Sequence, residues 1–62
     1  MNAYKLYFLG PTGMIARGAW MDCRDDAHAR LEAKARATGE AMELWQGERL
    51  VQEYPLALKL VG

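Results

Sequence analysis

Residues 4–13 have the sequence YKLYFLGPTG, and this stretch decides the class of fold. Apart from Lys5, its first six residues are aromatic or aliphatic, a composition typical of a β-strand. Its last four residues are types that favour tight turns. A second extended segment follows at about 14–22, so the sequence predicts a β-hairpin with a first strand at about 3–9.

The turn sets the expected register of this hairpin. With residues 11–12 at its centre, Phe8 is expected opposite Ile15, and Leu6 opposite Arg17. Because side chains alternate along a strand, each strand contributes to two faces. One face is expected to hold Tyr4, Leu6, Phe8, Ile15, Ala19 and Met21. The other is expected to hold Lys5, Tyr7, Leu9, Met14, Ala16 and Trp20.

A helix is predicted over about 25–38. Small apolar and polar residues alternate there, as in a strand, but Ala, Glu, Lys and Arg are strong helix formers and Ala is depleted from strands. Asp25 or Asp22 is the expected N-cap and Gly39 the expected C-terminal stop. Helical spacing predicts a narrow face toward the sheet, made of Ala27, Leu31, Ala35 and Thr38.

A second hairpin is predicted around Gly47 and Glu48, with strands at about 41–46 and 49–54. Glycine at the first central position favours a two-residue type II′ turn. That turn pairs Trp45 with Leu50, and Leu44 with Val51. Pro55 is expected to end the last strand, and the tail 55–62 is compatible with a strand, a short helix or an arm on a partner.

The predicted architecture is a single domain over 1–62 of the α+β class, with the order ββαββ. A crossover can place the third strand beside the first, giving an antiparallel sheet of about four strands with one helix on one face. The residues expected beneath the helix are Leu6, Phe8, Ile15, Leu44 and Val51.

The small size of the chain favours association. Folding 62 residues buries roughly 6,000 Å², about 60% of it apolar, which is worth roughly 90 kcal/mol at about 25 cal/mol/Å². Ordering the chain costs roughly 90 kcal/mol as well. One cysteine and one histidine provide neither an internal disulfide nor a metal cluster, so a second chain is the expected source of further stability.

One helix covers one face of the predicted sheet, and the other face keeps a contiguous apolar and aromatic surface. Such surfaces are uncommon on monomers and are rich in the residue types that interfaces favour. We therefore expect a homodimer. The interface is predicted to contain Tyr7, Leu9, Met14, Trp20, Trp45 and Leu50.

The charges favour neither nucleic acid nor membrane as a partner. Eight basic residues balance eight acidic ones, whereas nucleic-acid-binding domains usually carry a basic excess. No apolar run approaches the ~18 residues of a membrane span, and no signal peptide is evident. The lone cysteine suits a reducing compartment, so a cytoplasmic location is expected.

The sequence favours a protein that is not an enzyme and has no cofactor or metal. His28 has no nucleophile near it in sequence and is expected to be a solvated helix residue. Cys23 is expected to be a small residue at a strand end, with a reactive thiol near the helix start as the alternative. Asp25 and Asp26 are interpreted as helix-capping residues, since two carboxylates are too few for a hard cation.

Three segments, 4–9, 25–29 and 43–51, resemble a set of very short alphaproteobacterial hypothetical proteins. The shared features are a Tyr-rich first strand, a helix start that reads Asp-Asp-Ala-His-Ala here, and a hairpin with Glu-Leu-Trp-Gln-Gly. The resemblance implies the same fold and a bacterial origin, and it implies no activity. The function expected is a homodimeric interaction or accessory module, and the alternative is a small nucleic-acid-associated or antitoxin-like regulator.

Overall fold

The structure, a computed structural model, describes residues 1–56; the segment 57–62, which holds most of the tail, lies outside the described residues. Four strands and one helix follow one another in the order ββαββ, which confirms the predicted α+β class. The elements are β1 (Asn2–Leu9), β2 (Ile15–Cys23), α1 (Asp26–Ala35), β3 (Met42–Gln46) and β4 (Arg49–Tyr54).

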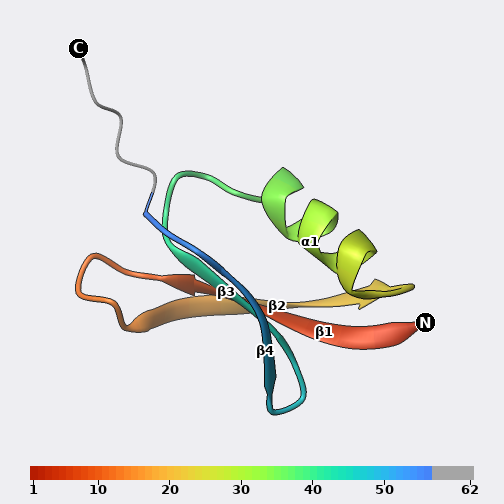
Figure 1. The fold of residues 1–62 in the computed structure, drawn as a ribbon. Coiled ribbons are helices and arrows are strands. Elements are labelled where there is room, and N and C mark those ends of the chain that lie inside the picture. Colours follow the sequence, from red (N-terminus) through yellow and green to blue (C-terminus); the bar gives the residue numbers. More distant parts are fainter. Residues whose placement is uncertain (57–62) are drawn as a thin grey trace.

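The sheet has the strand order β2-β1-β3-β4, and each neighbouring pair is antiparallel. The third strand therefore lies beside the first, as predicted. Because β1 pairs on both sides, the strand that opens the chain lies in the middle of the sheet (Figure 1). The two hairpins occupy the two halves of the sheet and meet along the boundary between β1 and β3.

The register predicted for the first hairpin is wrong by two residues. Phe8 lies opposite Arg17, and Leu6 opposite Ala19. The turn is longer than expected because the Gly10 N–H donates to the Met14 carbonyl at 2.7 Å. A β-bulge between Phe8 and Leu9 also brings Ile15 opposite Leu9, and 58% of Ile15 is exposed. The bulge therefore takes Ile15 off the helix-covered face, where it was expected.

The second hairpin follows the prediction at its turn and departs from it further along. Gly47 has a φ of +59°, the left-handed value that a type II′ turn requires at its first central position. Trp45 pairs with Leu50 as predicted, but Leu44 pairs with Gln52 because a bulge shifts the register between Leu44 and Trp45. Val51 still packs against the core, partly buried.

Helix α1 begins as predicted and ends earlier than predicted. The Asp25 side chain accepts a hydrogen bond from the His28 N–H at 2.8 Å, which makes Asp25 the N-cap. The helix ends at Ala35 rather than at residue 38, and the Arg36 N–H donates to the Glu32 and Ala33 carbonyls. An earlier end lets the chain turn back so that β3 can pair with β1.

The helix faces the sheet through Ala29 and Ala33, not through the predicted stripe. Both alanines are fully buried, whereas 69% of Leu31, the largest residue of that predicted stripe, is exposed. The Asp26 carboxylate sets the rotation of the helix, since it accepts a hydrogen bond from the Tyr4 hydroxyl at 2.7 Å and two from Arg49 at 2.9 Å. Asp26, Ala29 and Ala33 share one helix face, so Leu31 turns outward.

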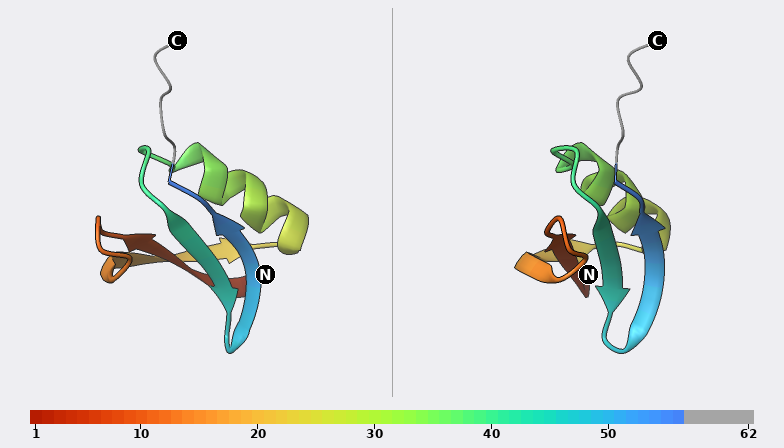
Figure 2. Two further views of the ribbon diagram at one scale, coloured as in Figure 1. Left: turned by 60° about the vertical axis from the view of Figure 1, so that its left-hand side comes forward. Right: turned by 90° about the vertical axis from the view of Figure 1, so that its left-hand side faces the viewer.

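The core lies between α1 and the sheet. Its buried side chains are Tyr4, Leu6, Phe8, Met21, Cys23, Ala29, Ala33, Met42 and Leu44. Two small alanines let the helix approach the sheet closely, and the turned views show α1 on one side of the sheet (Figure 2). No element of residues 1–56 packs on the other side of the sheet.

Candidate interaction surface

The sheet face opposite α1, which we call the open face, is built from two adjacent cross-strand rows. In the first row the register aligns Trp20 of β2, Lys5 of β1, Trp45 of β3 and Leu50 of β4. In the second row it aligns Gly18, Tyr7, Glu43 and Glu53. Aromatic and charged side chains therefore alternate in the middle of this face.

The structure brings most of the predicted interface residues onto the open face. Strand register places five of them there: Tyr7, Leu9, Trp20, Trp45 and Leu50. Met14 is exposed but lies in the turn before β2, so the register does not assign it to either face. Trp20 is 69% exposed, which is unusual for the largest apolar side chain.

Lys5 lies across the β2 half of the open face. Its Nζ is 4.5 Å from the centroid of the Trp20 ring and 5.9 Å from that of Tyr7, within the range of cation–π attraction. Gly18 makes this arrangement possible, because a Cβ there would lie 2.8 Å from Lys5 Cε and 3.3 Å from the Tyr7 ring. A side chain at residue 18 would therefore displace the Lys5 ammonium from this position.

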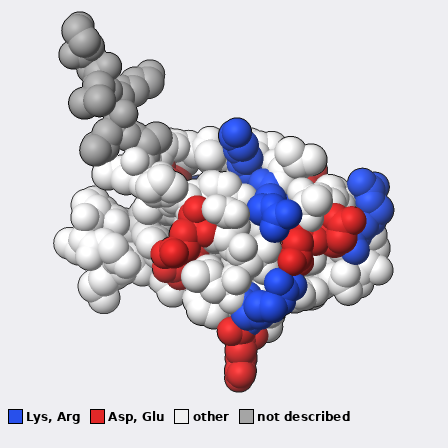
Figure 3. All heavy atoms as spheres, in the orientation of Figure 1, with Lys and Arg blue, Asp and Glu red and all other residues white. Residues whose placement is uncertain are grey.

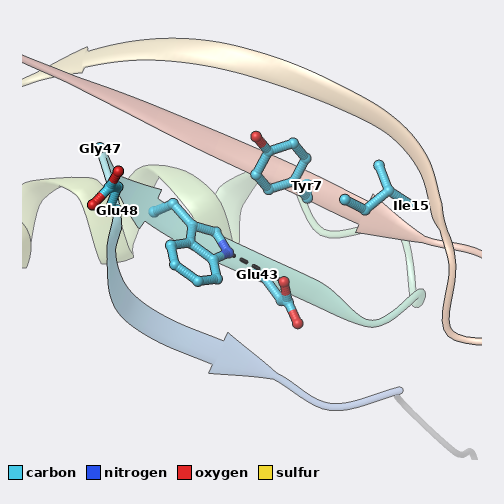
Figure 4. Close-up of a pocket in the computed structure, with 6 residues that line it drawn as sticks. Tyr7, Ile15, Glu43, Gly47 and Glu48 are labelled. Atoms are coloured by element: carbon cyan, nitrogen blue, oxygen red, sulfur yellow. Dashed lines mark hydrogen bonds between the residues drawn. The ribbon is translucent and has the colours of Figure 1, made fainter.

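A groove of about 340 Å³ lies on the open face, lined from β1, β2, β3 and the β3–β4 turn. Its lining combines two aromatic rings, two carboxylates, an aliphatic side chain and backbone (Figure 4). The lining residues are Tyr7, Ile15, Glu43, Trp45, Gly47 and Glu48. Among residues 1–56 no basic residue lines the groove, so its chemistry suits a cation on an apolar stem.

Glu43 is the central polar residue of this groove. It is half-buried, and its Oε1 accepts a hydrogen bond from Trp45 Nε1 at 3.1 Å, the dashed line in Figure 4. Glu53 lies directly opposite on β4, and like charges in that position destabilise a sheet. Among residues 1–56 no basic group lies within ion-pair distance of either carboxylate.

The charges divide unevenly between the faces. In the strands, the open face carries Lys5 against Asp22, Glu43 and Glu53. On the helix side, Arg49 pairs with Asp26 at 2.9 Å and Arg17 approaches Glu40 at 3.9 Å. The end of the molecule formed by the β1–β2 turn has no charged residue from 10 to 16 and is white in Figure 3.

Cys23 and His28, the candidate nucleophile and the candidate base, do not lie on the open face. Cys23 is buried in the core, and burial raises the pKa of its thiol, so the neutral thiol is favoured. His28 lies in α1, where its Nδ1 accepts a hydrogen bond from the Arg24 N–H at 3.1 Å. The Asp26 carboxyl, bonded by Arg49 and Tyr4, has its pKa lowered to about 2.

The acidic residues at the start of the helix have structural partners. Asp25 caps α1, and Asp26 joins α1 to β1 and β4. No three His, Cys, Asp or Glu side chains within residues 1–56 are grouped so that they could hold a metal ion. In the same part of the chain, no helix has the length and apolar character needed to cross a lipid bilayer.

Several residues in the groove or next to it were missing from the predicted interface. Strand alternation placed Lys5 on the open face, but Lys5 was not included among the predicted interface residues. Glu43 follows from alternation, because it is two residues from Trp45. Ile15 reaches this face only through the bulge after Phe8, which nothing in the sequence marks.

Comparison with protein-family models, curated proteins and solved structures finds no match for this chain. The bacterial resemblance described above therefore stays a prediction. The fold and the open face are the basis for a functional proposal.

Proposed function

We propose that this protein is a non-enzymatic interaction module that forms a homodimer through its open face. The observation that carries the proposal is the exposure of Trp20 and the half-burial of Trp45 and Tyr7 on the sheet face that no described element covers. Aromatic residues are enriched at the buried centres of protein interfaces. A partner would bury the open face, as α1 buries the opposite face of the sheet.

A second copy is the partner that best fits the charges at the centre of the open face. Lys5 on β1 and Glu43 on β3 lie on opposite sides of the β1–β3 boundary. A twofold axis along that boundary places β1 of each copy over β3 of the other, which brings opposite charges together. Asp22 and Glu53 lie on the edge strands β2 and β4, at the rim, where solvent screens their repulsion.

The titratable groups support a binding role over catalysis. Cys23 is buried with a raised thiol pKa, which disfavours the thiolate that acts as nucleophile. His28 has its Nδ1 occupied by a backbone N–H at the helix start. Within residues 1–56 neither Cys23 nor His28 lines the groove, where a substrate could meet the grouped residues that general acid–base or covalent catalysis requires.

Sedimentation velocity over a range of concentrations tests the homodimer. The chain has a mass of 7.0 kDa, and we expect a species of twice that mass at about 10 μM, in the affinity range of a small interface. A single species of monomer mass up to about 1 mM would overturn the proposal. If that monomer bound a Lys- or Arg-rich peptide, the occupant of the face would be a basic partner instead.

One observation favours the alternative of a nucleic-acid-associated regulator. Four basic residues around α1 are exposed and have no carboxylate within ion-pair distance among residues 1–56. They are Arg24, Arg30, Lys34 and Arg36. A gel shift with single-stranded RNA in about 50 mM salt, lost at about 200 mM, would support this function, and absence of a shift in the low-salt buffer would remove it.

A further inference from the structure

The groove on the open face has the chemistry of a site for a lysine side chain. The rings of Tyr7 and Trp45 form apolar walls, and the Trp45 hydrogen bond at 3.1 Å holds the Glu43 carboxylate in the same groove. An ammonium group on an aliphatic stem satisfies both parts, since the stem packs on the rings and the charge meets the carboxylate. A neutral apolar ligand would leave the Glu43 carboxylate without a counter-ion and would still cost its desolvation.

The open face itself supplies a cation of this kind. Lys5 is the one basic residue that the strand register places on this face among residues 1–56. Within its own chain the Lys5 ammonium lies over Trp20 of β2, 4.5 Å from the ring centroid, and it makes no ion pair with Glu43. The open face therefore carries both a cation and a groove suited to a cation, and the two are not paired within one chain.

We propose that, in the homodimer on which this inference rests, Lys5 of each copy occupies the Tyr7–Trp45–Glu43 groove of the other. Lys5 and Trp45 are directly opposite across the β1–β3 boundary, and Tyr7 and Glu43 are opposite in the next row. A twofold axis along this boundary therefore brings Lys5 over the partner's Trp45 and beside the partner's Glu43. The contact occurs twice, because each copy places its Lys5 in the groove of the other.

This arrangement also accounts for two local features that are unfavourable in a single chain. Glu43 lies directly opposite Glu53, an unfavourable pairing of like charges, and a lysine from a second copy would supply Glu43 with the counter-ion that it lacks among residues 1–56. Trp20 is 69% exposed. Trp20 of β2 and Leu50 of β4 lie at opposite ends of the same cross-strand row. The same twofold axis therefore places Trp20 over Leu50 of the second copy.

Charge reversal tests the exchange. We expect Lys5→Glu and Glu43→Lys each to weaken dimerisation at least about 100-fold, because each places like charges together at both contacts. Sedimentation velocity of an equimolar mixture of the two variants should then recover the dimer. In the mixed dimer one contact pairs the two introduced charges, which are opposite, and the other contact keeps the original lysine and glutamate.

A third variant controls for the change of net charge. Lys34→Glu makes the same substitution on the exposed side of α1, far from the proposed contacts, and it should dimerise like the wild type. A dimer weakened as much by Lys34→Glu as by Lys5→Glu would overturn the exchange, because net charge alone would then explain the loss.

The outcomes separate this inference from the homodimer proposal. A monomeric wild type overturns the homodimer and the exchange together. A dimeric wild type with equally dimeric Lys5→Glu and Glu43→Lys variants overturns the exchange alone. If Lys5→Glu and Glu43→Lys are monomeric both separately and when mixed, the exchange is also overturned. The two charges would then be needed within one chain and not between two copies.

A milder variant keeps the test valid if a charge reversal fails to fold, which far-ultraviolet circular dichroism reveals. Lys5→Met retains the aliphatic stem and removes the charge, and we expect it to weaken the dimer about 10-fold, within the range measured for charged contacts. Lys5→Arg keeps the cation and should preserve the dimer. Equal dimer affinities for Lys5→Met and the wild type would overturn the exchange.

Discussion

Strand β1 contributes alternate residues to the two faces of the sheet, and the two sets have different environments. Tyr4, Leu6 and Phe8 point toward α1, and each is at most 2% exposed. Lys5, Tyr7 and Leu9 point to the open face and are half-buried, with no described element above them. One strand of this protein is therefore both the centre of a core and the centre of a candidate interface.

The difference between the faces arises from the size of the side chains on the helix. Ala29 and Ala33 permit close packing, so a helix of ten residues is enough to bury one face. The same short helix cannot extend around the sheet, and no second helix is available among residues 1–56. Substitutions on the helix-covered face should therefore affect folding, whereas substitutions on the open face should affect association.

The largest expected effect is on the core. Leu44 on β3 is fully buried, and Leu44→Ala is expected to lower the free energy of unfolding by about 2–5 kcal/mol. Leu50 on the neighbouring strand is 42% exposed on the open face. Urea unfolding at concentrations where the chain is monomeric should show a cost of about 1 kcal/mol or less for Leu50→Ala. Equal costs would contradict the distinction between the faces.

Trp45 tests the open face as an interface. Trp45→Ala is expected to weaken dimerisation about 30-fold or more, because tryptophans at the centre of an interface contribute about 2 kcal/mol or more. Sedimentation equilibrium provides the measurement. The control is Leu31→Ala, which removes an exposed apolar side chain from the outer side of α1. A dimer weakened equally by both variants would place the interface elsewhere.

The Asp26 carboxylate gives the helix side a defined response to acid. Arg49 and Tyr4 hold the pKa of this carboxyl at about 2 in the folded chain, below its ordinary value of 3.8. Its stabilising contribution is therefore present above about pH 4 and is lost as the pH falls toward 2. Denaturant midpoints between these pH values should fall less steeply in Asp26→Asn than in the wild type.

A matched carboxyl on the other side of the molecule controls for general effects of acid. Glu48 lies in the β3–β4 turn, and its side chain makes no hydrogen bond within residues 1–56. Glu48→Gln is expected to keep the wild-type pH dependence. The same flattening in both variants would contradict the role assigned to Asp26.

The smallest expected effect is at the rim of the open face. Glu53→Gln removes one of the acidic residues on the edge strands, and we expect it to tighten the dimer by about two- to five-fold at low salt. The gain should disappear at about 1 M salt, where charges are screened within about 3 Å. A weaker dimer in this variant would indicate that Glu53 contacts a cation of the partner.

The sequence was sufficient to predict the order of the elements and, apart from Ile15, the strand residues assigned to each face of the first hairpin, because strand alternation is local. It predicted Asp25 as one of two possible N-caps, and it placed Trp45 opposite Leu50. It could not predict the rotation of α1, since this depends on the bonds from Asp26 to Tyr4 and Arg49, which are 22 and 23 residues away in sequence. Local helical spacing alone favoured the face with Leu31.

The β-bulges were the second limit. Neither the bulge after Phe8 nor the one after Leu44 involves a residue type that predicts a bulge. Each inserts one residue on one strand, so the register beyond it is offset. The bulge after Phe8 brings Ile15 into the groove, which requires the strand pairing to be known, whereas Trp45 and Glu43 meet because they are two residues apart on one strand.

The positions of the two tryptophans have a spectroscopic consequence. Both of the chain's tryptophans belong to the open face, whereas the aromatic residues of the core are Tyr4 and Phe8. Indole emission in this protein therefore reports on the solvation of the open face rather than on the packing of the core. Diluting an assembled sample should shift that emission to longer wavelength while the circular dichroism of the peptide backbone stays constant.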